Sequence, residues 1–308
     1  MKNVIKIILM LLLATCQNEG QKSNNDLVSK EISNIEEHTS TNNLERITTL
    51  AFDPAINDVY KRNMNSEEKA RFSFGQDVGI LFFDVWYPPI SYPGHHVNLK
   101  TYDFPVNLKF VPNYQGPEGF SGGPDGWGGW NLPSWVQAAK ELEQEGVKAI
   151  VGGCGLTGNI QKDLQDAVNI PVYSSTMVFV PELYGDLPEG QKVGVLTVSS
   201  RVLRAYDDQL YKQLGITDDM LIVQGMTESP DGADFMKIVG DEYDPKIVER
   251  SLVKVAAQFV KDNPEVGKII LECTDMCQYK SAVEEVTGLE VFDAVDMTKL
   301  AFERHGSR

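Results

Sequence analysis

The chain alternates short, wholly apolar runs with longer segments in which apolar residues recur every three or four positions. The runs VGILFFDVW after Asp77 and VGVLTV from Val193 predict two buried strands, each of which opens one half of the chain. Between positions 245 and 261 the spacing predicts an amphipathic helix whose buried face is formed by Val248, Leu252, Val255, Ala256 and Phe259. Both strand and helix periods are therefore present.

The same pattern predicts the remaining elements of each half. For the first half these are a strand at 106–111, a helix at about 132–146, a strand at 147–154 that ends at a cysteine, a second helix at 159–168 and a connection at 181–192. For the second half they are a helix at about 202–214, strands at 220–225 and 290–292, and a closing helix at 297–304. Strands that alternate with helices imply parallel sheets covered on both faces. We therefore predict two doubly wound α/β domains, 72–185 plus 294–308 and 186–293.

Two stretches of the chain can be aligned without a gap, and each carries a cysteine at the same place. They are VKAIVGGCGLTGNIQKDLQDAVNIPVYSS from Val147 and VGKIILECTDMCQYKSAVEEVTGLEVFDA from Val266, so that Cys154 aligns with Cys273, 119 positions later. Each copy predicts an apolar strand, a cysteine at its carboxyl end, an amphipathic helix and another strand. Because ligands bind beyond the carboxyl ends of such strands, we expect two thiols that face one another across a cleft between the domains.

Charge and the N-terminal composition limit the partners and suggest a location. The 308 residues carry a net charge of −16, which argues against nucleic acid and against electrostatic docking on an anionic membrane. Residues 1–16 contain two lysines and a short apolar run typical of a signal peptide, and LATC ending at Cys16 resembles a lipobox. Residues 17–71 are expected to form a polar tether. We expect an exported, lipid-anchored protein at the periplasm or cell surface; the alternative is a cytosolic protein with a frayed N-terminus.

Metal and cofactor chemistry finds little support in the sequence. Cys154, Cys273 and Cys277 show no CxxC spacing, which makes them a poor disulfide framework and a poor zinc site. The neighbouring His95 and His96 are interpreted as a polar loop pair rather than metal ligands. The glycine-rich insert at 116–129 lacks GxxxxGK and is interpreted as a flap over the cleft. We expect neither cofactor nor metal.

A thiol at a strand–helix junction has a specific chemical environment. The unpaired N–H groups and the positive end of the helix dipole should lower its pKa below the free value of ~8.5. Hydroxyls gather at other strand ends and could anchor a substrate carboxylate; they are Thr157, Ser174, Ser175, Thr176, Thr197, Ser199, Ser200 and Thr274. The alternative for Cys154 and Cys273 is two small buried side chains.

Each of three carboxylates at strand ends has two interpretations, one functional and one structural. Asp84 could orient a substrate ammonium or a water, or could cap a turn. Glu272 and Asp293 could tune the second thiol, or could cap helices.

Two thiols on opposite faces of a carbon acid can act as an acid/base pair. One thiolate removes the proton α to a carboxylate, and the other thiol donates a proton from the opposite face. This interconverts stereoisomers without a cofactor. If the β carbon carries a good leaving group, the carbanion eliminates it instead, and the same site becomes a lyase.

Short motifs resemble a known superfamily. GGCG at Gly152, ECTDM at Glu272 and VGVLT at Val193 resemble the aspartate/glutamate racemase superfamily over about residues 77–302. That resemblance implies two similar α/β domains, with one catalytic cysteine from each at the cleft. Many racemases have Cys-Asn-Thr where this chain has Cys154-Gly155-Leu156.

One branch of the superfamily is more similar. DVWYPP at Asp84, CGLTGNIQ at Cys154 and the run DNPEV…LECTDM…TGLEVFDA are similar to algal dimethylsulfoniopropionate lyases and their bacterial relatives. A sulfonium substrate would need an aromatic cage. Candidates for it, or alternatively for packing within the flap, are Trp86, Tyr87, Tyr92, Trp127 and Trp130.

Three functions remain open from the sequence. The leading hypothesis is a cofactor-independent racemase or epimerase of a small α-substituted carboxylate, with Cys154 and Cys273 as the acid/base pair. The second is a dimethylsulfoniopropionate lyase that forms dimethyl sulfide and acrylate. The third is a non-catalytic solute-binding lipoprotein. The expected partners are a small carboxylate, the membrane only through a lipid anchor, and a second copy in a homodimer.

Overall fold

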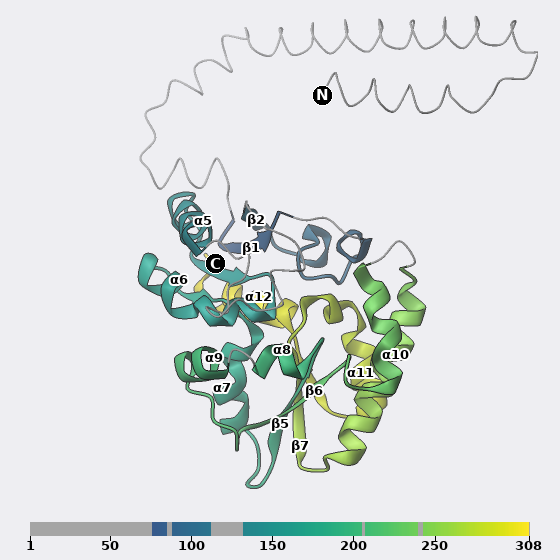
Figure 1. The fold of residues 1–308 in the computed structure, drawn as a ribbon. Coiled ribbons are helices and arrows are strands. Elements are labelled where there is room, and N and C mark those ends of the chain that lie inside the picture. Colours follow the sequence, from purple (N-terminus) through teal and green to yellow (C-terminus); the bar gives the residue numbers. More distant parts are fainter. Residues whose placement is uncertain (1–75, 85–87, 112–131, 205–206, 240–242, 308) are drawn as a thin grey trace, which may run out of the picture. The chain divides into compact units, whose positions relative to one another are not determined.

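The structure is a computed structural model that describes residues 76–84, 88–111, 132–204, 207–239 and 243–307 (Figure 1). The predicted signal peptide with Cys16, the tether and the glycine-rich insert lie outside the described residues. Both β-sheets of the protein belong to one compact unit. Within the described part of the chain, no helix combines the length and apolarity that a membrane crossing needs.

Two four-stranded parallel sheets form the framework, and their strand orders are the same. The first sheet has the order β2-β1-β3-β4, with strands Val106–Val111, Val78–Phe83, Ala149–Gly152 and Val172–Tyr173. The second has the order β6-β5-β7-β8, with strands Leu221–Gly225, Lys192–Thr197, Val266–Leu271 and Glu290–Phe292. We call each sheet, with the helices packed on it, the first and the second lobe. The predicted α/β class with two related parallel sheets is confirmed.

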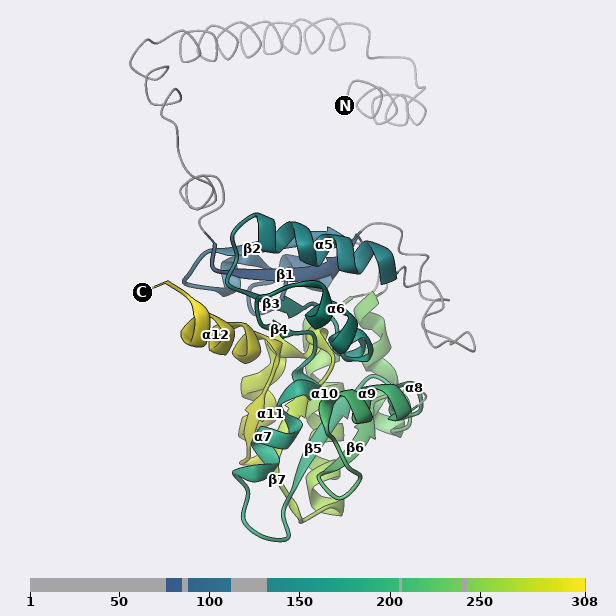
Figure 2. The ribbon, with the colours of Figure 1, turned by 90° about the vertical axis from the view of Figure 1, so that its left-hand side faces the viewer.

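Helices cover both sheets. On the first sheet these are α5, α6 and α12, at Leu132–Gln144, Gln161–Ala167 and Ala294–His305. Around the second sheet they are α7, α8, α9, α10 and α11, at Val180–Gly185, Ser200–Arg204, Asp207–Leu214, Pro245–Asp262 and Lys280–Thr287 (Figure 2). Short 3-10 helices complete the described fold: η1, η2, η4, η5, η6 and η7, at Pro88–Ser91, Leu99–Thr101, Gly155–Ile160, Thr176–Phe179, Pro230–Val239 and Thr274–Tyr279.

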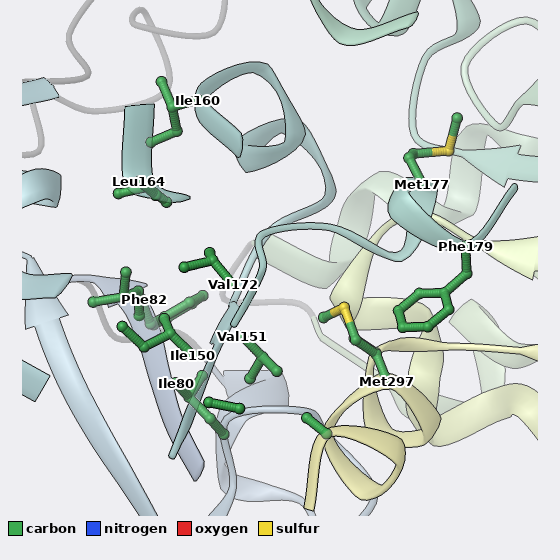
Figure 3. Packing of buried hydrophobic residues seen from close by; sticks show 14 of the residues in the cluster. Ile80, Phe82, Ile150, Val151, Ile160, Leu164, Val172, Met177, Phe179 and Met297 are labelled. Atoms are coloured by element: carbon green, nitrogen blue, oxygen red, sulfur yellow. The ribbon is translucent and has the colours of Figure 1, made fainter. Parts of the chain in front are cut away.

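The core of the first lobe joins residues from distant parts of the chain. Ile80 of β1, Ile150 of β3, Leu164 of α6 and Met297 of α12 belong to one hydrophobic cluster and are all fully buried (Figure 3). Burying one such side chain stabilises the fold by about 1.5–3 kcal/mol. The last helix, α12, therefore packs on the first sheet although it follows the last strand of the second.

Local sequence explains where α10 begins and which face it buries. The Asp244 side chain accepts a hydrogen bond from the Lys246 N–H at 2.8 Å, and Pro245 stands at the first helical position. The predicted apolar face is buried as expected, which confirms that interpretation; it consists of Val248, Leu252, Val255, Ala256 and Phe259.

Some predicted elements differ from the structure. The expected connection at 181–192 contains the short helix α7, because Pro181 occupies a helix start, where proline is tolerated. The expected helix at 202–214 is described as two helices, α8 and α9. The closing helix α12 begins three residues earlier than predicted, because Asp293 caps it.

Candidate active site

The two aligned cysteines occupy equivalent positions. Cys154 follows β3 and is the N-cap residue of η4, and Cys273 follows β7 and is the N-cap residue of η7. Both have extended backbone and both side chains are half-buried. Each sulfur is therefore next to the first N–H groups of a helical turn, where backbone donors are unsatisfied.

The segments that carry the cysteines are in direct contact. The Thr274 hydroxyl donates to the Gly153 carbonyl at 2.9 Å. On the other side of Cys154, a Cβ placed on Gly155 would lie 2.1 Å from Glu272 Oε1 and 2.4 Å from the Glu272 carbonyl oxygen. The residue before each cysteine thus contacts the residue after the other one. This reciprocal arrangement brings the Cys154 and Cys273 segments face to face where the lobes meet.

The pKa values of both thiols differ from the sequence expectation. Burial, followed by the charge of Glu272, raises the pKa of Cys154. Burial, followed by the charge of Asp275, raises the pKa of Cys273. The predicted lowering is therefore wrong, because desolvation and nearby carboxylates outweigh the helix N–H groups. A charge on Cys154 also raises the pKa of Cys273, so the two thiols interact electrostatically.

Cys273 begins a chain of buried polar contacts. Its thiol lies 3.7 Å from Asp275 Oδ2, and the other oxygen of Asp275 accepts from His95 Nε2 at 2.8 Å. The Nδ1 atom of His95 accepts from the Val97 N–H at 3.2 Å, so the neutral ring carries its proton on Nε2. His95 is fully buried. His95 lies in a loop, as predicted, but its ring is buried and paired with Asp275.

Glu272 lies at the Cys154 end of the site. Its side chain is 3% exposed, and its Oε2 accepts from the Thr197 hydroxyl at 2.8 Å. Its Oε1 has no hydrogen-bond partner among the described residues. Burial raises the pKa of Glu272 to about 7. At neutral pH a large share of this carboxyl group is therefore uncharged.

His96, the neighbour of His95, supports the strand that leads to Cys154. Its Nε2 donates to the Gly152 carbonyl at 3.1 Å, and its Nδ1 lies 2.9 Å from the Tyr102 hydroxyl. Burial lowers the pKa of His96 to about 3, which keeps the ring neutral. In the part of the chain that the structure describes, no three His, Cys, Asp or Glu side chains gather as metal ligands would.

The hydroxyls predicted to bind a carboxylate make hydrogen bonds within the protein. The Thr157 hydroxyl contacts the carbonyl oxygens of Cys154 and Ser174. The Ser174 hydroxyl donates to Gln161 Oε1 at 2.7 Å, and the Ser175 hydroxyl caps η5 by accepting from the Met177 N–H. The structure places these side chains at strand ends, as expected, but gives them partners that secure the framework. Their role toward a substrate stays a prediction, as does that of Thr197 and Thr274.

The remaining candidates take different positions. Asp84 is exposed at the end of β1, and its backbone N–H donates to the Val111 carbonyl at 3.2 Å. Asp293 accepts from the N–H groups of Val295 and Asp296, so it caps α12. Cys277 is buried in the hydrophobic core.

An aromatic cluster lies near Asp275. Tyr92 packs edge-on against Tyr243 with ring centroids 5.5 Å apart, and the Tyr243 hydroxyl lies 2.8 Å from that of Tyr279. Burial raises the pKa of Tyr243, and the charge of Asp275 adds to the effect. Of the predicted cage residues Tyr92 is described; Trp86, Tyr87, Trp127 and Trp130 lie outside the described residues.

Sequence reasoning missed His95 and Asp275 as a pair. They are 180 positions apart, and only the packing of the lobes joins them. Asp275 stands two positions after Cys273, which was a usable signal. Nothing local in the sequence pointed to His95 as its partner.

The fold is that of a solved racemase. The structure of allantoin racemase from Pseudomonas fluorescens has a TM-score of 0.50 and 16% sequence identity, and the match covers 75% of this chain and 93% of that one. No family model matches the sequence.

Curated relatives by sequence are lyases. Dimethylsulfoniopropionate lyase from Durusdinium sp. clade D is 25% identical over 71% of this chain and 71% of its own length. Dimethylsulfoniopropionate lyase 7 from Emiliania huxleyi (strain CCMP1516) is 25% identical over 71% of this chain, and the match spans 64% of that lyase. The predicted resemblance to the racemase superfamily and its lyase branch is confirmed. Together these matches support an acid/base enzyme for a small carboxylate.

Proposed function

We propose that the protein is a cofactor-independent enzyme in which Cys154 and Cys273 move a proton at the α carbon of a small carboxylate. The observation that carries this proposal is the reciprocal contact of the two cysteine segments, Gly153 with Thr274 and Gly155 with Glu272. It brings together, where the lobes meet, the two segments that carry the half-buried thiols. Such a pair suits proton transfer on either side of one carbon.

The surroundings of the two thiols support different roles. The backbone N–H groups of Leu156 and Thr157 favour the thiolate of Cys154. The Asp275 N–H does the same for Cys273, but this thiol also has the Asp275 carboxylate as its acceptor, which favours the protonated form. In the proposed reaction Cys154 is therefore the base, and Cys273 stays protonated.

For the reaction that follows, we propose β-elimination from a sulfonium carboxylate. Cys154 takes the α proton, the C–H electron pair forms the new C=C bond, and the carbon–sulfur bond breaks to release a neutral sulfide. The curated lyases support this choice. The partly exposed Tyr92 and Tyr243 also support it, since aromatic faces attract sulfonium cations.

Racemisation is the second candidate, and the paired thiols favour it. A carbanion held between Cys154 and Cys273 can be reprotonated from the opposite face if no leaving group departs. Racemisation needs each thiol in both protonation states, whereas elimination needs one base. The unequal partners of the two thiols therefore fit elimination better.

Isotope exchange and product analysis test this proposal. The purified protein is incubated in heavy water with a panel of small carboxylates that includes dimethylsulfoniopropionate. Release of dimethyl sulfide into the headspace, lost in Cys154→Ser, is the expected result. Deuterium at the α carbon with retained substituents would indicate racemisation. Full ligand affinity with neither reaction, unchanged in Cys→Ala variants, would support solute binding and overturn the proposal.

A further inference from the structure

A buried carboxyl group sits where the two cysteine segments meet. Glu272 precedes Cys273 in the chain, yet its side chain extends toward the Cys154 segment, over the Cα atom of Gly155. Any side chain at position 155 would collide with it, so the glycine is what leaves room for the carboxyl group. Thr197 of β5 holds one oxygen, and the other is without a hydrogen-bond partner among the described residues.

Desolvation governs the charge state of such a group. A buried carboxylate with one hydroxyl donor has little to replace the water it has lost, so the neutral acid is favoured. The titratable groups that interact electrostatically with Glu272 are Cys154 after β3 and Cys273 after β7, and Asp275 of η7 acts on the same two thiols. All three are acids, and none of them offers a positive charge that would stabilise the Glu272 carboxylate.

We propose that Glu272 is a positioning residue for Cys154: wedged against Gly155, its carboxyl group sets the charge state of Cys154, which loses its proton less readily when Glu272 is ionised than when Glu272 is neutral. The inference rests on the proposed function, because the charge of Cys154 matters for the reaction only if Cys154 is the base. The effect of Glu272 on that charge can be measured without a substrate. When Glu272 ionises, its charge opposes that of the thiolate and raises the pKa of Cys154. The pKa of Glu272, about 7, places this change near neutrality.

Thiol alkylation as a function of pH tests the inference without any substrate. The protein is treated with iodoacetamide between pH 6 and 10, and the modification of Cys154 and of Cys273 is followed by mass spectrometry of their peptides. In Glu272→Gln the carboxyl group cannot ionise, so the midpoint for Cys154 should fall by about one pH unit or more. Glu272→Ala should shift it in the same direction, and circular dichroism checks that both variants are folded.

Glu228 provides a matched control in the same lobe. It follows β6 and accepts from the Ser199 hydroxyl at 2.7 Å and from the Ser200 N–H at 3.1 Å. Glu228→Gln should leave the Cys154 midpoint unchanged. A Cys154 midpoint that stays at its wild-type value in Glu272→Gln, or that moves equally in Glu228→Gln, would overturn the inference.

The failure of the proposed function has a different signature. If Cys154→Ser retains full turnover while Glu272→Gln shifts the alkylation midpoint, the catalytic role of Cys154 is wrong and the control of its charge by Glu272 stands. If Cys154→Ser abolishes turnover and the midpoint does not move, the reaction stands and the role of Glu272 is wrong.

Discussion

The two cysteine segments have the same backbone arrangement but different chemical neighbours. Each cysteine follows a strand and is the N-cap residue of a 3-10 helix. In the alignment of the two copies, Glu272 corresponds to Gly153 and Asp275 corresponds to Leu156. The second copy therefore supplies both acids, and the first supplies neither. The duplication preserves where the thiols stand, whereas substitutions beside them decide what each thiol can do.

The acids also act across the lobe boundary. The charge of Glu272 affects Cys154 of the other lobe as well as Cys273. His95, which the first lobe contributes, holds the acid that neighbours Cys273. Two cysteines at equivalent positions thus need not have equal reactivity. The difference between the Cys154 and Cys273 segments can be tested by experiment.

The largest expected difference between the Cys154 and Cys273 segments is in the effect of their substitution on turnover. For elimination, Cys154→Ser should lower kcat/KM by about 10³-fold, because it removes the base. Cys273→Ser should lower it by at most about 10²-fold, since the leaving group departs without a proton. The rate of dimethyl sulfide release measures both. Equal losses in the two variants would instead indicate racemase-like use of the thiols.

The second difference concerns stability as a function of pH. The folded-state pKa of Glu272 is about 7, against 4.5 for an unperturbed Glu, so burying the group costs nothing below pH 4.5 and the full amount above pH 7. Glu272→Gln should therefore exceed the wild type in free energy of unfolding by about 3 kcal/mol at pH 8. Urea denaturation at several pH values measures the gain, which should vanish near pH 4.5.

Glu228→Gln should show the opposite sign in the same experiment. Burial raises the pKa of Glu228, but hydrogen bonds from Ser199, Ser200, Thr227 and Arg201 together lower it by more, so its net shift is downward. Its carboxylate stabilises the fold above the unfolded pKa, and the variant should be less stable than the wild type at pH 8. A gain in both variants would show that surface charge, rather than burial at the lobe boundary, explains the effect.

The two adjacent histidines allow a smaller test of the same comparison. His95→Ala removes a hydrogen bond to the Asp275 carboxylate and should lower the free energy of unfolding by about 2 kcal/mol beyond the cost of the cavity. His96→Ala leaves a cavity of the same kind and loses two contacts between neutral groups, to the Gly152 carbonyl and to the Tyr102 hydroxyl, worth about 1 kcal/mol each. Chemical denaturation at pH 7 measures both. A loss in His95→Ala no greater than the cost of its cavity would contradict the importance of the Asp275 contact.

The smallest expected effect is at the contact between the segments. Thr274→Val removes the hydroxyl that donates to the Gly153 carbonyl and should cost about 1 kcal/mol of stability. Thermal unfolding is the simplest measurement. A stability equal to that of the wild type would mean that the lobes are held together here by packing alone.

The sequence was sufficient for the framework and for the positions of the thiols. The gapless alignment of the two copies predicted both parallel sheets, because strand and helix periods and the cysteine positions recur together. The buried face of α10 followed from the spacing of its apolar residues. These features depend on local order along the chain, which a single sequence records.

The electrostatics of the site could not be predicted in the same way. The helix-end argument gave the wrong direction for the thiol pKa, because the depth of burial and the side chain of Glu272 arise from the packing of two lobes. The hydroxyls of Ser174 and Ser175 stand at strand ends as expected, but their partners Gln161 and Met177 became visible only in three dimensions.

The way α12 returns to the first sheet has a practical consequence. Ser307 donates its backbone N–H to Asp77 at 2.7 Å, so the end of the last helix lies beside the start of β1. A short linker there, with new termini opened at 186–191, would give a circularly permuted chain. In it the first sheet and α12 would be encoded by one uninterrupted stretch and the second sheet by another, joined by a single crossing. Such a chain could be divided into two halves, which would allow the thiol-bearing modules to be exchanged between related enzymes.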